Sequence, residues 1–356
     1  MDSGVKKSGV TSSQVARRAG VSQSAVSRTF TPGASISPKT REKVMAAAQE
    51  LGYRPNAIAR SLITNRSRII AVVMAYLENL FYPDVLEELG RLLVKENYRL
   101  LLFTGHMDRD SDPVFDQLMQ YRVDGIILAS TTLSSQLSEE CATAGIPVVL
   151  FNRTTERDAV SSVTTRNREG GRRIGEFLLA GGHRRFGYIS GVESSSTNRD
   201  RFAGYQDALT EAGHAEILLE VGNYDRAEAE AAARKLLSRD DRPDAIFVAN
   251  DHMAVAVMDV ARYEFGLSIP DDLSIVGYDD VGPARWSSYG ITTVSQPLTR
   301  MVEATVNILM GQISSGEIEA EHRILSGDLI VRSSARLPKT GIVEIDGRRI
   351  YKPGKV

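Results

Sequence analysis

The sequence predicts a small all-helical head followed by a large α/β body of two lobes. Three observations predict this fold: a strongly basic segment over the first 68 residues, two short helices separated by a tight turn, and an alternation of apolar strands with amphipathic helices from Ile69 onward. The 356 residues are 42% hydrophobic and 25% charged, a globular composition sufficient for about two or three domains. The single cysteine, Cys141, excludes an internal disulfide and favours a reducing cytoplasm.

The overall net charge of −2 is the average of two unlike parts. Residues 1–68 contain twelve Lys and Arg against three Asp and Glu, which gives a net charge of +9. The remaining residues contain 31 basic and 42 acidic side chains, a net charge of −11. A basic head on an acidic body indicates a polyanion-binding module joined to a second function. Charge alone leaves a solvated basic tail as an equal alternative.

Helix signals at the start of the chain predict a helix-turn-helix. Thr11 and Gln14 fit a capping box that opens a short helix, which Gly20 ends. Ser22 is a suitable N-cap for a second helix over residues 23–28. Because only two residues separate the first helix from this cap, the connection is the tight turn of a helix-turn-helix.

A third helix and a short linking segment complete the basic part. Ser37 caps a helix with Pro38 at its first position, where a missing N–H costs nothing, and this helix stops at Gly52. We therefore assign residues 1–50 to the helix-turn-helix head and residues 51–68 to a hinge helix and linker. The helical pattern within the linker, residues 56–62, is too short to be stable alone in water.

The second helix of such a motif enters the major groove of double-stranded DNA with its N-terminal residues first. Gln23 and Ser24 are therefore expected to contact base edges, with Arg28 one turn further on and able to reach a guanine. Nearby hydroxyl groups suit phosphates, which position the module without reading sequence; they belong to Thr11, Ser22, Ser27 and Thr31. The alternative is a helical hairpin with a purely structural role, which the +9 charge of the head disfavours.

These motifs together resemble the DNA-binding head of the lactose-repressor (LacI/GalR) family. The matching residues are Val15-Ala16, Ala19-Gly20-Val21-Ser22, Ala25-Val26-Ser27-Arg28, Ser37-Pro38-Lys39-Thr40-Arg41-Glu42-Lys43-Val44, and the run from Leu51 to Leu62. The resemblance continues through the acidic body to about Ala335. It implies a hinge helix that forms on the operator, with Leu62 as a wedge between base steps, Ala59 against the minor-groove floor and Asn56 at a phosphate. The alternative for these hinge residues is an ordinary linker.

The acidic body, residues 69–338, alternates strands with helices in two successive series. The expected strands are 69–74, 99–103, 125–129 and 147–151, then 186–190, 215–219, 245–249 and 273–278, and the helices between them include 85–96, 168–180, 201–211 and 252–265. Two such series predict two α/β lobes with parallel sheets, and ligands are expected in a cleft at the carboxyl ends of the strands. The family resemblance implies a periplasmic-binding-protein-like body whose chain crosses back after residues 291–295. Lobe 1 is then about 69–163 plus 293–325, and lobe 2 about 164–292 plus 326–338.

Amide, carboxylate, guanidinium and aromatic side chains follow the expected strands at corresponding places. Such groups suit a sugar or similar polyol, because hydroxyls need polar partners and the apolar sugar face stacks on a ring. The candidate effector-binding residues are Phe81, Tyr82, Ser130, Asn152, Arg153, Thr197, Arg201, Tyr224, Asn250 and Asp279. The resemblance implies that Arg201, Asn250 and Asp279 bind the effector and that Phe81 and Tyr224 form aromatic walls. A salt-bridge role for Arg201 is the alternative, as are helix caps for Asp251 and Asp280.

One position departs from the family pattern. The family usually has Asp-Asn before a glycine and a helix, whereas this chain has Arg166-Asn167. A guanidinium is unfavourable near a helix N-terminus, so Arg166 is expected either to lie in solvent or to face an anionic effector.

The leading hypothesis is a transcriptional regulator, most simply a repressor, acting as a cytoplasmic homodimer on a pseudo-palindromic operator under the control of a sugar-like effector. A solute-binding protein of a transport system is the alternative, which the helix-turn-helix and the absence of a signal-peptide pattern disfavour. An α/β enzyme with a DNA-binding appendage is disfavoured because no phosphate-binding loop, H-E-x-x-H or nucleophile elbow is present. No cofactor, metal site or membrane span is expected. The tail, residues 339–356, lacks leucine heptads, so a dimer is expected in preference to a tethered tetramer.

Overall fold

The computed structural model describes residues 10–31, 33–54, 66–74, 77–104, 117–129, 140–155 and 159–354. The chain divides into two compact units, Met1–Ser67 and Arg68–Val356, which are described separately. The predictions made for Asn56, Ala59, Leu62 and Ser130 lie outside the described residues.

In the described part of the head, three helices enclose a small apolar core. They are α1 (Ser12–Ala19), α2 (Gln23–Thr29) and α3 (Pro38–Leu51). Each begins at the expected cap: Thr11 and Gln14 form the capping box, and the side chains of Ser22 and Ser37 accept from backbone N–H groups of α2 and α3. The core consists of Val15, Ala16, Val26, Val44, Ala47 and Ala48, with one contribution at least from every helix.

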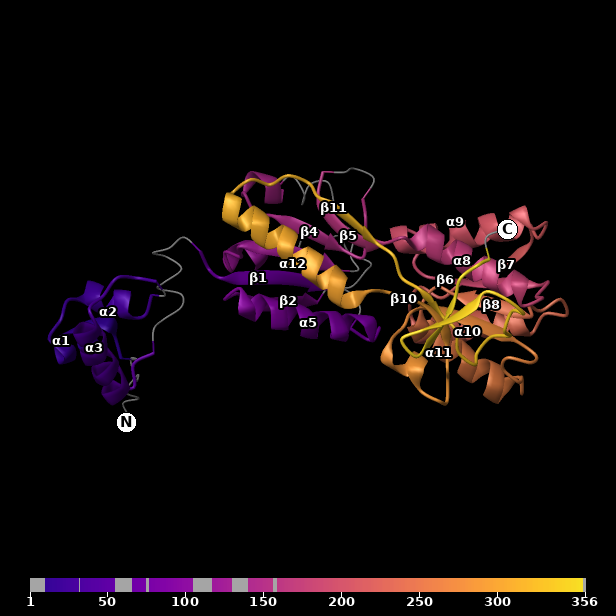
Figure 1. Cartoon of the computed structure of the whole chain (residues 1–356), viewed down its shortest axis with the longest axis horizontal. Helices are drawn as coiled ribbons and strands as arrows, with labels where there is room; N and C mark the ends of the chain where they lie inside the picture. Colours follow the sequence, from indigo (N-terminus) through magenta and orange to yellow (C-terminus); the bar gives the residue numbers. More distant parts are fainter. Residues whose placement is uncertain are drawn as a thin grey trace, which may run out of the picture. The chain divides into compact units, whose positions relative to one another are not determined.

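The first lobe of the body is a parallel sheet covered by helices (Figure 1). Its described strands are β1 (Ile69–Met74), β2 (Arg99–Thr104), β3 (Gly125–Ala129), β4 (Val148–Phe151), β5 (Ser161–Thr165) and β11 (His322–Leu325), in the spatial order β11-β5-β4-β3-β1-β2. The helices α5 (Phe81–Lys95) and α12 (Leu298–Ser315) pack against each other, and their apolar faces join the core of this sheet. The central strands β1, β3 and β4 are nearly continuous apolar runs because both of their faces are buried.

The second lobe repeats this architecture with a longer sheet. Its described strands are β6 (Phe186–Ser190), β7 (Ile217–Val221), β8 (Ala245–Val248), β9 (Ser274–Asp279), β10 (Thr292–Ser295), β12 (Leu329–Ile330), β13 (Ile342–Ile345) and β14 (Arg348–Tyr351), in the order β13-β14-β12-β10-β9-β8-β6-β7. The helices form two pairs, α8 (Asn167–Ala180) with α9 (Ser196–Glu211), and α10 (Arg226–Leu237) with α11 (Asp251–Asp259), the last continuing as a π-helix, η1 (Val260–Glu264).

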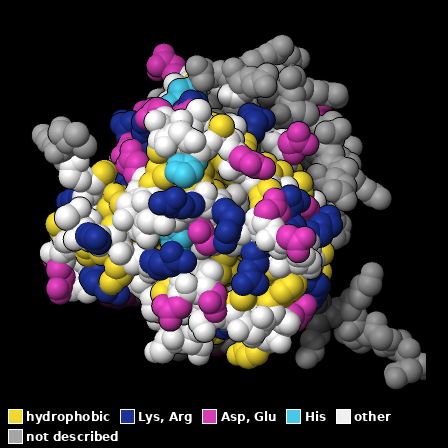
Figure 2. Space-filling view, turned by 90° about the vertical axis from the view of Figure 1, so that its right-hand side faces the viewer, with side chains coloured by type: hydrophobic (Ala, Val, Ile, Leu, Met, Phe, Trp, Pro, Cys, Tyr) yellow, Lys and Arg dark blue, Asp and Glu magenta, His cyan; other side chains and the backbone are white. Residues whose placement is uncertain are grey.

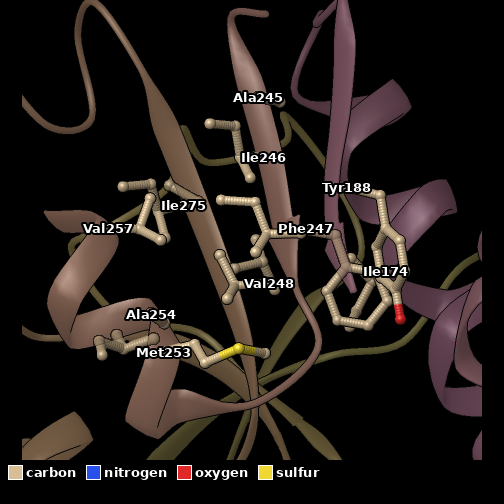
Figure 3. Close-up of a cluster of buried hydrophobic side chains, with 14 of the residues drawn as sticks. Ile174, Tyr188, Ala245, Ile246, Phe247, Val248, Met253, Ala254, Val257 and Ile275 are labelled. Carbon is tan, nitrogen blue, oxygen red and sulfur yellow. The ribbon is translucent and has the colours of Figure 1, made fainter. Parts of the chain in front are cut away.

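Alternation along β8 shows how this sheet joins the two helix pairs. In Figure 3, Ile246 and Val248 point toward Met253 and Val257 of α11, whereas Phe247 points to the other side, where it meets the ring of Tyr188. The Phe247 and Tyr188 ring centroids are 5.1 Å apart, and both side chains are fully buried. Period-two alternation therefore gives each face of the sheet its own apolar layer.

The observed boundaries between the lobes differ from the expected ones. Strand β10 pairs with β9, so the chain crosses back to lobe 1 after Ser295 rather than at residue 293. Strand β5 ends at Thr165 and pairs with β4 and β11, so lobe 1 extends past residue 163. The boundary differs because residue 293, where the crossing was expected, lies within β10, and β10 belongs to the second sheet.

The C-terminal tail, residues 339–356, which we assigned separately from the body, contributes two strands to the second sheet. Strands β13 and β14 form a hairpin around Asp346 and Gly347, both with positive φ, and β14 pairs antiparallel with β12. An Asp-Gly pair with positive φ is the turn that two-residue hairpins favour. Tyr351 fixes the hairpin: its ring lies 5.2 Å from that of Phe177.

The expected apolar strands otherwise lie within one or two residues of their observed bounds, and the expected helices start up to five residues late. Within the described residues, no helix combines the length and the apolar character that crossing a membrane requires.

Candidate functional site

The exposed face of α2 is the candidate DNA-reading surface. Val26 and Thr29 of this helix are buried in the head, which leaves Gln23, Ser24 and Arg28 exposed. Residues four apart lie on the same side of a helix, so Ser24 and Arg28 share one exposed stripe. Gln23 Nε2 donates to Ser12 Oγ at 2.9 Å, which holds the Gln23 side chain beside the start of α1. The three predicted base-contacting side chains are thus on one accessible face.

The predicted phosphate-contacting hydroxyls surround that face but several already have intramolecular partners. Thr11 and Ser22 accept from the backbone N–H groups of Gln14 and Ala25 as helix caps. Thr31 Oγ1 donates to the Ser27 carbonyl at 2.9 Å. The Thr11 hydroxyl also donates to Gln14 Oε1 at 3.2 Å, and Ser22 Oγ lies 2.9 Å from Ser24 Oγ, so a phosphate would have to compete with these contacts.

The second candidate site is a cleft at the carboxyl ends of the body's parallel strands. It is lined by Asn79, Tyr82, Asn152 and Arg153 from the first lobe and by Thr197, Arg201, Tyr224, Asn250 and Asp279 from the second. The structure therefore brings together all the described residues that we expected to bind effector, with the exception of Phe81. Asn79 is an addition that sequence reasoning missed.

Strained backbone marks the ends of these strands. Asn152, Tyr224 and Asp279 have φ values of +57°, +60° and +114°. Residues other than glycine rarely occupy this region, and such strain accumulates at binding sites. The strain turns the side chains that follow β4 and β9 out of the sheet and into the cleft.

Arg201 is the centre of the second-lobe wall. Its side chain is 2% exposed; Nε donates to Asn167 Oδ1 at 3.0 Å, Nη1 to the Ala249 carbonyl at 2.6 Å and Nη2 to Asp279 Oδ1 at 3.4 Å. Its guanidinium carbon lies 3.6 Å from the centroid of the Tyr278 ring. Arg201 therefore lines the cleft and also forms a salt bridge with Asp279, so its geometry fits both of the expected roles.

The pKa values of both members of the buried ion pair, Arg201 and Asp279, are shifted. Burial raises the pKa of Asp279, and Arg201 and Gln296 oppose that rise. For Arg201, burial is the largest single effect and lowers the pKa, but Asp279 together with Tyr224, Tyr278 and Tyr188 raises it, and the net shift is upward. Gln296 Nε2 donates to Asp279 Oδ1 at 2.7 Å. Gln296 is thus a supporting residue that sequence reasoning missed, because it follows a strand that was assigned to the crossing.

Close packing of α8 on α9 positions Arg201. A Cβ on Gly171 would lie 1.9 Å from the carbonyl oxygen of Arg201, and a Cβ on Gly204 would lie 1.8 Å from that of Arg168. Only glycine allows the two helix backbones to approach this closely. Asn167, at the start of α8, consequently reaches the Arg201 guanidinium.

Arg153 links the two walls of the cleft. Its Nη1 donates to the Asn152 carbonyl at 2.8 Å and to Thr197 Oγ1 at 2.9 Å, and its guanidinium carbon lies 5.9 Å from the Tyr224 ring centroid. The free space left in the cleft is about 10 Å³, which is no more than one water molecule needs. A sugar therefore enters only when the lobes separate or Arg153 moves.

Two buried polar atoms of the lining have no hydrogen-bond partner among the described residues, Asn152 Oδ1 and Asn250 Nδ2. Asn250 caps α11 through its Oδ1, which accepts from the Met253 N–H at 3.0 Å and leaves the amide nitrogen pointing elsewhere. Buried polar atoms are normally paired, so an unpaired acceptor and an unpaired donor in one cleft indicate a ligand that supplies both functions.

The positions of Phe81, Asp251 and Asp280 show what these side chains contact. Phe81 does not line the cleft: it is buried in the first lobe, with its ring 6.3 Å from that of Phe151. Neighbouring residues at the start of a helix point about 100° apart, so only Tyr82 faces the cleft. Asp251 is fully buried and accepts from the Val281 N–H at 3.2 Å, and Asp280 pairs with Arg332 at 2.6 Å.

The departure at Arg166 is a surface feature. Its side chain is exposed, with Glu169 at 3.9 Å, and it points to no ligand site. Asn167, which follows it, is buried. Cys141 is also buried, and burial raises the pKa of its thiol to about 12, so the thiol stays protonated at neutral pH. In the described ranges, no group of three or more His, Cys, Asp or Glu could hold a metal ion.

Comparison with known proteins assigns both units. Residues 12–56 match the bacterial regulatory proteins of the lacI family, and residues 176–335 match the periplasmic binding protein-like domain. The chain is 32% identical over 327 residues to the HTH-type transcriptional repressor PurR of Vibrio campbellii, covering 90% of this chain and 97% of that protein. It is 33% identical over 329 residues to the HTH-type transcriptional regulator CelR of Thermobifida fusca, covering 90% and 96%.

Solved structures give the same result. The lac repressor dimer bound to operator and an anti-inducer superimposes with a TM-score of 0.82 at 28% identity, covering 92% of this chain and 99% of that chain. The complex of the transcriptional regulator CelR with cellobiose gives a TM-score of 0.70 at 31% identity, covering 92% and 100%. The predicted fold, a helix-turn-helix head on a two-lobed binding body, is confirmed.

Proposed function

The chain belongs to the lacI family of bacterial regulatory proteins, and from that premise we propose that it is a cytoplasmic dimeric repressor whose operator affinity is set by a sugar-like ligand in the cleft. The observation that carries the proposal is the presence, in one chain, of an exposed α2 face and a polar cleft bridged by Arg153 and Thr197. Two copies of α2 on a symmetric dimer read two half-sites of a pseudo-palindromic duplex. A solute-binding protein of a transport system has no need of a DNA-binding helix-turn-helix, which disfavours that alternative.

The residues of the cleft divide between ligand contact and support. Asn152, Arg153, Tyr224 and Asn250 face the ligand, the ring supplying an apolar surface for a sugar face. Arg201 and Gln296 hold Asp279 in place, and Asn167 holds Arg201. The ligand changes operator affinity only to the extent that it binds one arrangement of the two lobes more tightly than the other.

A binding-site selection tests the proposal. The full chain selects duplexes from a random pool, and fluorescence anisotropy then measures operator affinity at several salt concentrations with and without sugars. We expect a palindromic consensus, affinity that falls steeply with salt, and a change in operator affinity with at least one sugar or sugar derivative. Selection of no consensus sequence contradicts the proposal.

A variant of the candidate reading face sharpens this test. Ser24→Ala is expected to relax the preference at particular operator positions, whereas Ser35→Ala, outside the helices of the head, is expected to leave the consensus unchanged. Equal losses on all sequences would mean that Ser24 contacts only phosphate.

A further inference from the structure

The walls of the cleft contain more positive than negative charge. Among the described residues that line it, Arg153 and Arg201 are cationic and Asp279 is the carboxylate. Arg201 and Asp279 pair with each other, both almost fully buried. Asp279 Oδ1 is also occupied by Gln296, so this carboxylate is fully engaged within the second-lobe wall. The lining therefore keeps a net positive charge, because Asp279 attracts Arg153 as well but forms its ion pair with Arg201.

Arg153 contacts neutral groups only. Among the described residues, Arg153 contacts the Asn152 carbonyl and the Thr197 hydroxyl, both through Nη1, and the face of Tyr224. A guanidinium carries five N–H donors and stays charged at any physiological pH, so most of its donor capacity is unused among the described residues. Arg153 is nevertheless 7% exposed. A buried charge without a counter-ion is costly, which makes an anion in the cleft strongly favourable.

The surface arginines of the second lobe provide the contrast. Arg234 pairs with Glu264 at 2.7 Å and Arg239 with Asp241 at 2.8 Å. Figure 2 shows Lys and Arg side chains interspersed with Asp and Glu on one face of the body. Arg234 and Arg239 thus have carboxylate partners at the surface, whereas the buried Arg153 forms no ion pair among the described residues.

The unpaired amide atoms specify the rest of the ligand. Asn152 Oδ1 accepts and Asn250 Nδ2 donates, and one sits on each wall of the cleft. A hydroxyl group both donates and accepts, so a polyol satisfies the two asparagines together. An anion without hydroxyls could accept from Asn250 Nδ2 but would leave Asn152 Oδ1 without a donor.

We propose that the ligand of this cleft is a polyhydroxylated anion, a sugar acid or a sugar phosphate, whose charged group pairs with Arg153 while its hydroxyls bind Asn152 and Asn250. The inference rests on the proposed function, because it names the ligand class of the same cleft. A carboxylate or phosphate takes two parallel hydrogen bonds from a guanidinium, which gives this arginine both affinity and orientation. Binding of the anion also replaces the Thr197 contact and so acts directly on the link between the lobes.

Matched ligand pairs test the inference on the full-length protein by isothermal titration calorimetry. The probes are glucuronate and gluconate against glucose, galacturonate against galactose, and glucose 6-phosphate against glucose. We expect at least one anion to bind tenfold or more tightly than its neutral partner; the acid and phosphate arms show which group is preferred. The inference is overturned if no anion binds more tightly than its neutral partner.

Charge variants at Arg153 assign the preference to that side chain. Arg153→Gln is expected to bring the ratio of anion affinity to neutral-sugar affinity down to about one, and Arg153→Lys to keep part of the preference. Arg239→Gln is the matched control, because Arg239 is exposed and paired on the surface. An anion preference that persists in Arg153→Gln contradicts the assignment; the wild-type comparison of matched ligands stands without any variant.

The two proposals fail differently. If neutral sugars bind and change operator affinity while anions show no advantage, the inference falls and the proposed function stands. If a sugar acid binds through Arg153 without changing operator affinity, the inference stands and the proposed function falls.

Discussion

Replacing Gly204 by alanine tests how the packing of α8 on α9 supports the cleft. The added Cβ would lie 1.8 Å from the Arg168 carbonyl oxygen and 2.9 Å from the Arg172 nitrogen. An ordinary carbon–oxygen contact is about 3.3 Å, so the helices must separate by roughly 1.5 Å. The obstacle is backbone, which cannot rotate away as a side chain can. Arg201, three residues earlier in α9, then moves relative to Asn167.

The expected magnitude follows from two opposing effects. Overpacking typically destabilises by about 1–3 kcal/mol, and a backbone clash belongs at the upper end of that range. Alanine in place of glycine in a helix interior returns up to ~1 kcal/mol. We therefore expect Gly204→Ala to lose about 2 kcal/mol of unfolding free energy. Gly311→Ala in α12 is the matched control: nothing lies within 4 Å of its added Cβ, so it is expected to be neutral or stabilising.

Urea unfolding measures both variants. The only tryptophan of the chain, Trp286, lies in the second lobe and reports that lobe by fluorescence, while circular dichroism follows the whole chain. Ligand affinity is expected to fall in Gly204→Ala and to be unchanged in Gly311→Ala. The reasoning is refuted if Gly204→Ala is as stable as the wild type, or if Gly311→Ala loses as much.

Gln23→Ala should relax base preference at particular operator positions at a cost of about 1–3 kcal/mol, read by anisotropy on a panel of mutated duplexes; uniform weakening would show that Gln23 contacts only the DNA backbone. Asp251→Asn should stabilise the body at neutral pH, because burial raises the pKa of Asp251. The wild type then loses stability as pH rises above about 4 toward that raised pKa. In urea titrations the stability difference between Asp251→Asn and the wild type should therefore grow with pH. A difference that does not depend on pH would contradict this account. Tyr351→Ala should cost about 3 kcal/mol by removing the ring that fixes the hairpin on Phe177, and an unchanged unfolding midpoint would mean that the hairpin adds nothing to the lobe.

The sequence predicts best the elements that bury unbroken apolar runs. Strands β1, β3 and β6 begin and end at the predicted residues, because a parallel strand covered on both faces is recognisable from composition alone. The caps of α1, α2 and α3 are equally local signals. In each case the chemistry that defines the element lies within the element itself.

Strand β5 shows where such reasoning fails. Its sequence, Ser161 to Thr165, is rich in hydroxyls, yet every residue is buried. The two serine hydroxyls are paired with residues distant in sequence: Ser161 Oγ accepts from Gln312 Nε2 at 3.0 Å, and Ser162 Oγ contacts His322 Nδ1 at 2.8 Å. A search for apolar strands cannot find a polar strand whose partners lie about 150 residues away.

The sequence was sufficient to predict which residues follow the strands and come together at the cleft. It was not sufficient to predict what each side chain contacts there. Phe81 and Tyr82 are adjacent aromatics, and only the start of α5 decides which of them faces the cleft. The hairpin of the tail carried an Asp-Gly signal in Asp346 and Gly347, which its many charged neighbours concealed. Gln296 and Asn79 enter the site through tertiary contacts that no local pattern encodes.

The central claim is that the ligand state of the cleft and the operator state of the head are coupled. The most direct test measures the ligand dissociation constant of the full-length protein by calorimetry with and without saturating operator duplex, and the operator dissociation constant with and without saturating ligand. Coupling requires that both constants change by the same factor, expected to be between about 5-fold and 150-fold. A ligand dissociation constant that is the same with and without operator would contradict the claim.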